Sequence, residues 1–374
     1  MNQFGFPSIV GMIIVFVLQL DWLTTICCGQ LSRDEMRSAL ETFRHNHDVP
    51  AIFAAIAFDE REPLIASNGI RRIGDDSAVT DDDLVHIGSC TKAMTAVLVA
   101  RLVESGQLSW NETLGERLPE LCDQIDAGWH SVTLTQLLSH QSGMPANARN
   151  WWLRRGESMN EIRDQILIEN LKEPPSNSND ASFLYSNLGY MAAGQMAARA
   201  NGTTWEEAIR QHVFEPLGIT TAGFGPPGTI GQVDQPWGHL RGQDGKWYSR
   251  QFDNAPALGP AGVVHLGLRD WCRFVTVFCG ACPPGFLTDD SLRRLTTPLV
   301  NHYALGWGVA ERKWAQGTTF SHSGSNTMWD CVVWVAPNTR RAYMVAANCH
   351  DENTRQWLDQ LVGELIRMER SARQ

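Results

Sequence analysis

The stretch His86-Ile-Gly-Ser-Cys-Thr-Lys-Ala-Met-Thr-Ala-Val-Leu-Val-Ala-Arg101 places a serine and a lysine three positions apart at the start of an apolar run. If the run is helical, Ser89 and Lys92 share one face, so the hydroxyl and the amine can meet. The backbone N–H of Ser89 would then point toward an anion that forms at the helix start. An amine beside buried surface needs a partner or loses its proton, and a neutral amine can serve as a base. The stretch therefore predicts a nucleophile, a base and half of an oxyanion hole.

The Ser-x-x-Lys spacing is weak support by itself, because about one chain in four of this composition would contain it by chance. The alternative interpretation is a surface lysine on a helix that begins with a capping serine. Only four of the 31 Lys and Arg residues are lysines. The rest of the sequence must decide between the two interpretations.

Length and composition indicate a globular protein of ordinary type. The chain has 374 residues, of which 43% are hydrophobic and 19% charged, so it can bury a large core. Its formal net charge of −10 and the lack of a basic stripe argue against a nucleic-acid partner.

The N-terminus carries an apolar run from Ile9 to Leu20, which is about the length of a signal-peptide core and short for a membrane span. We expect residues 1–29 to be a signal peptide cleaved near Gly29, or else an uncleaved N-terminal anchor; a lipid on Cys27 or Cys28 is a third alternative. The body, residues 30–374, is then exported, either periplasmic or secreted, and meets a membrane only through such an anchor.

Seven cysteines follow Gly29, an odd number, so at least one thiol is free or pairs with another chain. Cys279-Gly-Ala-Cys282 could form a local disulfide in an oxidising compartment. A zinc half-site would need a second pair, and the sequence has none. We expect no metal and no cofactor.

Strand patterns at both ends of the chain flank a mostly helical middle. Residues 51–58 and 63–70 predict a β-hairpin, and residues 303–309, 318–321, 331–336 and 342–347 predict consecutive antiparallel strands. Helical periodicity marks residues 32–47, 89–104, 133–140, 159–171, 187–199, 205–213, 266–278 and 353–370. The predicted fold class is α+β: an antiparallel sheet, with terminal helices covering it, built from about 30–106 and 260–374, and an inserted mainly helical part over about 107–259. A site at the seam between the parts is expected.

Two further motifs carry groups suited to proton transfer and anion binding. Tyr185-Ser-Asn187 starts a predicted helix; a phenol with a lowered pKa can move a proton, and the Asn187 amide can donate and accept. His322-Ser-Gly-Ser325 ends a predicted strand, where Gly324 permits close approach and a backbone N–H could complete an oxyanion hole. Viewed singly, the first is a helix cap with a core tyrosine and the second a glycine turn.

In this order the three motifs resemble the serine β-lactamase and penicillin-binding-protein superfamily, and the Tyr-x-Asn form resembles its class C β-lactamase-like branch, with its esterase and D-peptidase relatives. The resemblance covers about residues 32–366. It also includes Leu137-Leu-Ser-His-Gln-Ser-Gly-Met-Pro145, Glu215-Pro-Leu-Gly218 and Gly259-Pro-Ala-Gly262.

The resemblance implies a role for each motif residue. Ser89 would be the acylated nucleophile, with Lys92 and Tyr185 as the proton-transfer pair. Asn187 would contact both the substrate and Lys92. The backbone N–H groups of Ser89 and Ser325 would form the oxyanion hole, beside Gly324.

His322 departs from the family pattern, which usually has a lysine there to hold the substrate's carboxylate. A neutral imidazole supplies less charge, so we expect an exported serine hydrolase that cleaves an ester or amide of a small or peptide-like substrate rather than an efficient penicillinase. A β-lactamase or D-alanyl-D-alanine carboxypeptidase is the alternative, and a catalytically silent binding module of the same fold is the second alternative.

Four other features have plain interpretations. Gly223-Phe-Gly-Pro-Pro-Gly228 matches a dinucleotide-binding pattern but lacks the strand–turn–helix context and is expected to be a loop. His140 is expected to be a structural hydrogen-bond donor, and Cys90 to pack inward. Trp151 and Trp152 are candidates for the cleft lining, and packing in the core is the equally weighted alternative.

Overall fold

The computed structural model describes residues 1, 30–59, 61–152, 156, 158–175 and 182–373. The predicted signal peptide or anchor therefore lies almost wholly outside the described residues. Within the described part, no helix has both the length and the apolar character that crossing a membrane requires.

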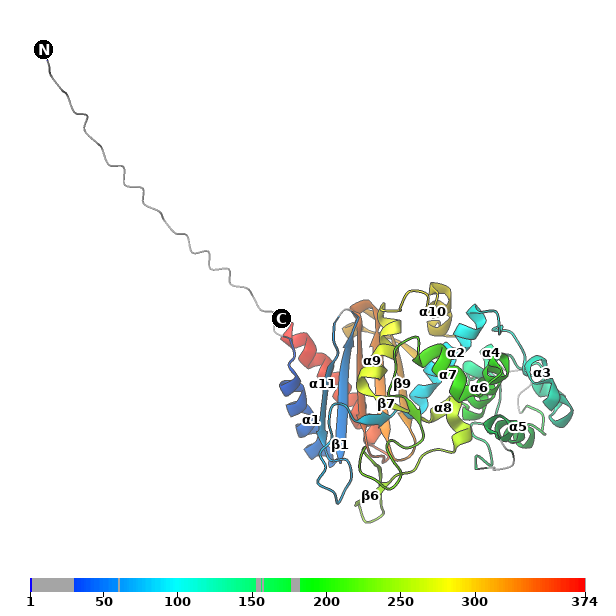
Figure 1. Cartoon of the computed structure of the whole chain (residues 1–374), viewed down its shortest axis with the longest axis horizontal. Helices are drawn as coiled ribbons and strands as arrows, with labels where there is room; N and C mark the ends of the chain where they lie inside the picture. Colours follow the sequence, from blue (N-terminus) through cyan, green and yellow to red (C-terminus); the bar gives the residue numbers. More distant parts are fainter. Residues whose placement is uncertain (2–29, 60, 153–155, 157, 176–181, 374) are drawn as a thin grey trace.

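A six-stranded antiparallel sheet forms the centre of the molecule, in the order β2-β1-β11-β10-β9-β8 (Figure 1). Its strands come from both ends of the chain: β1 (Ala51–Phe58), β2 (Leu64–Gly69), β8 (Gly308–Arg312), β9 (Gly317–Ser325), β10 (Asp330–Ala336) and β11 (Arg341–Ala347). Strands from the N-terminal and C-terminal parts of the chain meet in the middle of this sheet, where β1 pairs with β11 from Ile52–Ala347 to Phe58–Arg341.

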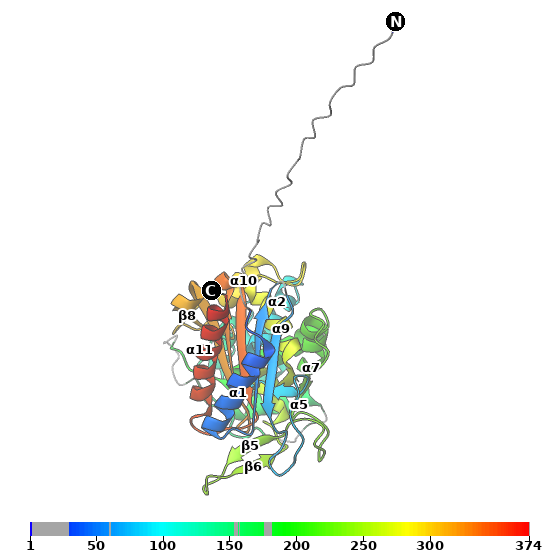
Figure 2. The ribbon, with the colours of Figure 1, turned by 90° about the vertical axis from the view of Figure 1, so that its left-hand side faces the viewer.

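Both faces of the sheet are buried, which explains the almost unbroken apolar runs of β1 and β11. On β1, Ile52 and Ile56 pack into one core layer while Phe53 and Ala55 pack into the other, following the two-residue period of a strand. Helices α1 (Arg33–His47) and α11 (Thr354–Ala372) cover the first face, as Figure 2 shows.

The opposite face packs against the helices of the middle region, with α2 and α9 nearest to the sheet (Figure 1). These helices are α2 (Thr91–Glu104), α3 (Leu114–Arg117), α4 (Leu134–Leu138), α5 (Met159–Asn170), α6 (Asn187–Asn201), α7 (Trp205–Ile209), α8 (Gly259–Gly262), α9 (Leu268–Thr276) and α10 (Asp289–Thr296). Two small sheets complete the fold: β3 (Leu84–His86), β7 (Val264–Gly267) and β4 (Gly223–Phe224) in one, and β5 (Gly238–Arg241) with β6 (Trp247–Arg250) in the other.

The predicted α+β fold class is confirmed, with local corrections. The small sheet of β3, β7 and β4 was not predicted, and its strand β4 is formed by Gly223 and Phe224, at the start of the stretch expected to be a loop. The strand expected at residues 303–309 is wrong: the chain turns at Gly306, in the left-handed region at φ +87°, and β8 begins only at Gly308. A Cβ on Gly306 would lie 2.6 Å from the Cα of Ala93, so the turn lets the chain pass close to α2. The β5–β6 hairpin, which lies within the stretch expected to be helical or loop, was not predicted.

Candidate active site

Ser89 lies in a 3₁₀ turn, Gly88–Cys90, that leads directly into α2. The nucleophile position is thus one turn before the helix, where backbone N–H groups have no partner within the helix. Lys92 is fully buried on the first turn of α2, and its Nζ lies 3.0 Å from the Oγ of Ser89. The structure therefore brings the two side chains together as the spacing predicts.

Lys92 is held by two groups that can only accept hydrogen bonds. Its Nζ lies 2.7 Å from the backbone oxygen of Ala261 and 2.8 Å from Oδ1 of Asn187. Burial lowers the pKa of Lys92 well below its ordinary value of 10.5, opposed by the nearby Cys90 thiol. A neutral amine has two N–H groups and one lone pair. Because the two acceptors take both N–H groups, the lone pair is left to face the Ser89 hydroxyl.

Tyr185 precedes α6, whose N-cap is Ser186. The Ser186 hydroxyl accepts from the Gly189 N–H and donates to the Pro145 carbonyl, fixing the segment that presents Tyr185. Burial raises the pKa of the Tyr185 phenol, although a hydrogen bond with Ser89 acts in the opposite direction. Desolvation outweighs the hydrogen bond, so the pKa of the Tyr185 phenol lies above its ordinary value.

Asn187, the first residue of α6, orients its amide between two partners. Its Oδ1 accepts from Lys92, and its Nδ2 donates to Oδ1 of Asn147 at 2.8 Å. The contact between Asn187 and Lys92 that the resemblance implies is present.

The end of β9 lies against the turn that carries Ser89. A Cβ on Gly324 would be 2.0 Å from the Ile87 carbonyl oxygen and 2.9 Å from the Ser89 amide nitrogen. A Cβ on Gly88, which is left-handed at φ +45°, would be 2.3 Å from the amide nitrogen of Ser325. The amide groups of Ser89 and Ser325 are thus neighbours because glycine occupies both facing positions.

His322 is turned toward its own strand and an adjacent tyrosine. Its Nδ1 lies 2.7 Å from the Ser323 carbonyl oxygen and its Nε2 3.2 Å from the Tyr303 hydroxyl. Since a carbonyl only accepts, Nδ1 carries a proton. The His322 ring centroid lies 6.3 Å from that of Tyr185, so the imidazole lies beside the tyrosine ring.

A buried cluster behind the Ser89 turn consists of His86, Asp253 and Asn326, and no sequence motif predicts it. His86 accepts from the Gly88 N–H at its Nδ1 and meets Asp253 through Nε2 at 2.9 Å. Asn326 donates to the same carboxylate oxygen at 2.9 Å. The cluster fixes the residue before the nucleophile relative to the turn after β9.

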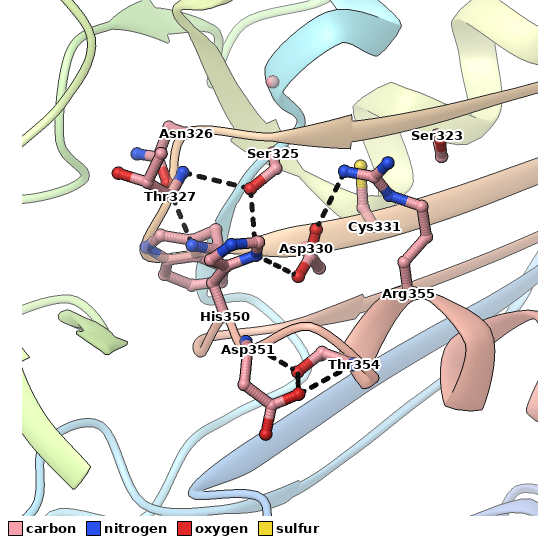
Figure 3. Close-up of polar contacts among 12 residues, drawn as sticks. Ser323, Ser325, Asn326, Thr327, Asp330, Cys331, His350, Asp351, Thr354 and Arg355 are labelled. Carbon is pink, nitrogen blue, oxygen red and sulfur yellow. Dashed lines mark hydrogen bonds and ion pairs between the residues drawn. The ribbon is translucent and has the colours of Figure 1, made fainter. Parts of the chain in front are cut away.

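A second cluster, at the other side of that turn, joins β9, β10 and the start of α11 (Figure 3). His350 Nδ1 lies 2.6 Å from Oδ2 of the fully buried Asp330 and 3.4 Å from Oγ of Ser325. Arg355 approaches the other Asp330 oxygen at 3.5 Å. The hydrogen bond with Asp330 raises the pKa of His350. No motif links these residues in the sequence, because they meet only in the folded sheet.

His140 is buried at the far side of the Tyr185 ring, with centroids 4.3 Å apart. Its Nδ1 accepts from the Ser186 N–H at 3.0 Å, so the expected donor role is wrong for this contact. Burial lowers the pKa of His140 to about 2. The imidazole is therefore neutral and structural.

The seven cysteines in the described part of the chain are free thiols, Cys279 and Cys282 included. Cys90 packs inward as expected, with its Sγ 3.7 Å from that of Cys331 on β10. Burial opposes ionisation of the Cys90 thiol, whereas its contact with Cys331 acts in the opposite direction and lowers its pKa. In the part of the chain that the structure describes, no cluster of three His, Cys, Asp or Glu side chains could hold a metal ion.

A cavity of about 450 Å³ opens above Ser89. Asn187 and Ser325 line it, together with Trp151 and Trp152, the two tryptophans expected at the cleft. A second cavity, of about 410 Å³, lies on the side of Tyr185 and His322. Ser89 lines the first cavity, and Tyr185 and His322 line the second.

A helix-flanked antiparallel sheet with this Ser-Lys-Tyr arrangement defines the β-lactamase/transpeptidase-like class of folds. The chain belongs to the Beta-lactamase family, whose model matches residues 36–362.

Comparisons with individual proteins agree with this assignment. Penicillin-binding protein 4 of Amycolatopsis lactamdurans is 29% identical over 179 residues, covering 48% of this chain and 46% of that protein. The chain spans about half the length of the curated relatives it matches. D-amino acid amidase from Ochrobactrum anthropi SV3 superposes with a TM-score of 0.73 at 18% identity, over 91% of this chain and 99% of that one. D-alanine carboxypeptidase AmpC from Burkholderia cenocepacia gives 0.68 at 21% identity, over 88% and 99%.

Proposed function

We propose that the protein is a serine hydrolase that cleaves an ester or amide through an acyl-enzyme on Ser89. The observation that carries the proposal is the saturation of both Lys92 N–H groups by Ala261 and Asn187. It leaves the lone pair of a neutral amine 3.0 Å from the Ser89 hydroxyl, which is what activation of a serine requires.

The proposed reaction has two acyl-transfer steps. Ser89 Oγ attacks the carbonyl carbon while Lys92 takes the hydroxyl proton, and the oxyanion is stabilised by the amides of Ser89 and Ser325. Tyr185, hydrogen-bonded to Ser89, donates its proton to the leaving atom and is reprotonated at the expense of the Lys92 ammonium. Water then enters where the leaving group stood, and the same groups return the acyl chain as a carboxylic acid.

The His322 environment supports a substrate without an essential carboxylate next to the scissile bond. Its Nδ1 proton is used by the Ser323 carbonyl, and its Nε2 faces the Tyr303 hydroxyl. A lost charge-assisted contact is worth about 10- to 100-fold in affinity, so we expect a chromogenic cephalosporin to be a poorer substrate than a simple ester by at least that factor.

The test is hydrolysis of p-nitrophenyl acetate by the purified residue 30–374 body. We expect Ser89→Ala to lower kcat/KM by about 10⁴-fold or more. The matched control is Ser105→Ala, which removes a serine at the end of α2 far from the Lys92 amine and should keep full activity. Equal rates for Ser89→Ala and the wild type would refute the proposal, and a cephalosporin turned over faster than the ester would favour the β-lactamase alternative.

A further inference from the structure

An apolar groove of about 580 Å³ continues from the Ser89 cavity toward β4. The two cavities share Trp152, Phe252, Asp253 and Asn254, so one ligand can occupy both. The groove lies within the size range of small-molecule sites. Its apolar walls, called the acyl groove below, are Trp152, Met159, Phe224, Ile230, Phe252 and Val263.

The acyl groove exposes large apolar side chains that the fold leaves uncovered. Among the described residues eight large hydrophobic side chains are exposed, and three of them line this groove: Trp152 at 47%, Phe252 at 53% and Ile230 at 71%. The Trp152 and Phe252 rings stack at 5.3 Å, forming a flat wall. Apolar surface gathered in this way marks a binding site more often than chance exposure does.

The two carboxylates that line the groove already have partners within the protein. Glu206 is paired with the buried Arg163 at 2.5 Å. Asp253 is held by His86 and Asn326. Neither carboxylate therefore needs a cation from the ligand.

The position of Tyr185 decides which part of the substrate the groove would hold. The leaving atom must lie near the Tyr185 hydroxyl to receive its proton, on the side of the cavity that Tyr185 and His322 line. The acyl part then extends to the other side of Ser89, where Asn187 and Phe252 lead into the acyl groove.

We infer that the acyl groove binds an extended apolar acyl chain, so that the preferred substrates are esters or amides of medium-chain or bulky apolar carboxylic acids. The inference rests on the proposed function, because it assigns the acyl side of that same reaction.

The test measures kcat/KM for p-nitrophenyl esters from acetate to decanoate. We expect kcat/KM to rise about two- to fourfold for each added methylene until the groove is filled, the gain that burying a CH₂ provides. A second series varies the alcohol of simple acetate esters, and there we expect little dependence on chain length, because the alcohol lies on the Tyr185 side.

Two variants of exposed groove residues, Ile230→Ser and Phe252→Ala, should lower the octanoate-to-acetate ratio of kcat/KM by about 10-fold. The matched control, Tyr248→Ala, removes an exposed aromatic of β6 and should keep the wild-type ratio.

Three results would overturn the acyl groove while leaving the proposed function intact: a flat acyl series with Ser89-dependent acetate hydrolysis, chain-length dependence on the alcohol instead, or an unchanged ratio in both variants. Failure of the proposed function has a different signature, since Ser89→Ala would then hydrolyse every ester as fast as the wild type.

Discussion

Lys92 shows how burial prepares one residue for chemistry. Desolvation disfavours the charged form of this amine and lowers its pKa well below the ordinary value, and two fixed acceptors contact its Nζ. Tyr185 is affected in the opposite sense, because burial keeps its phenol protonated. We therefore propose that Lys92 enters the reaction as the base and Tyr185 as the proton donor.

This division predicts the pH profile of the reaction. Activity requires neutral Lys92, so kcat/KM should fall as pH drops through a pKa well below 10.5. Tyr185→Phe should lower kcat by about 10²- to 10⁴-fold without moving that midpoint. The measurement is kcat/KM against pH for both proteins, with Lys246→Met as a surface-lysine control. A midpoint that moves in Tyr185→Phe would instead identify the phenol as the base.

The pair of His350 and Asp330 predicts a pH-dependent part of the stability. Because Asp330 raises the pKa of folded His350, the pair stabilises the fold fully below the unfolded pKa of about 6.5. This stabilisation is lost as pH rises through the raised folded pKa.

Urea unfolding at pH 5.5 and pH 8.5 checks this prediction. We expect His350→Gln to reduce the free energy of unfolding more at pH 5.5 than at pH 8.5, whereas His45→Gln, an exposed histidine of α1, should show no such difference. An equal loss at the two pH values would count against the ion pair.

Among the elements, β9 and the turn before α2 depend on each other. Backbone atoms make this contact, and it is possible only because the residues at the contact have no side chain. Gly324 and Gly88 both face the opposite segment at distances that a methyl group cannot occupy.

We therefore expect Gly324→Ala to lower kcat by about 10²- to 10³-fold, the usual effect of losing one oxyanion donor. The control is Gly363→Ala in α11, where the nearest atom to an added Cβ is 3.7 Å away, and which should stabilise the protein by about 0.5–1 kcal/mol with unchanged kcat. Steady-state kinetics and urea unfolding of both variants test this, and wild-type kcat in Gly324→Ala would refute the close backbone contact.

Elements with strong periodicity were predictable from the sequence, whereas elements defined by a turn were not. The hairpin of β1 and β2 and the closing helix α11 follow from apolar spacing alone. The strand expected at Tyr303 failed because its apolar residues pack around the tight turn at Gly306 instead of alternating across a sheet. The turn at Gly306 lets the chain pass close to α2, which is far away in the sequence. The spacing of residues around Gly306 therefore cannot predict it.

At the scale of the whole molecule, the site joins segments that are far apart in sequence. The pairing of Ser89 with Lys92 was predictable because both lie within a stretch of four residues. The family resemblance added Tyr185, Asn187 and the end of β9. The sequence could not show that Asp253 would meet His86 and Asn326, since that contact needs β3, the segment before α8 and the turn after β9 to be in place together.

Asp253 should accordingly affect both stability and activity. Asp253→Ala leaves His86 and Asn326 without their shared acceptor, and we expect it to cost about 1–3 kcal/mol in the free energy of unfolding and to lower kcat. Urea unfolding and ester kinetics measure the two effects, with the exposed Asp76→Ala as control. Unchanged stability and kcat would show that the cluster does not position the Ser89 turn.

The central claim, that Ser89 is an activated nucleophile, is tested most directly by fluorophosphonate labelling of residues 30–374 followed by intact-mass measurement and peptide mapping. The account predicts one adduct per chain, located on Ser89 and absent from Ser89→Ala. It also predicts much slower labelling of Lys92→Met, because the base is missing. No adduct on the wild type, or an equal adduct on Ser89→Ala, would contradict the account and favour a silent binding module of the same fold.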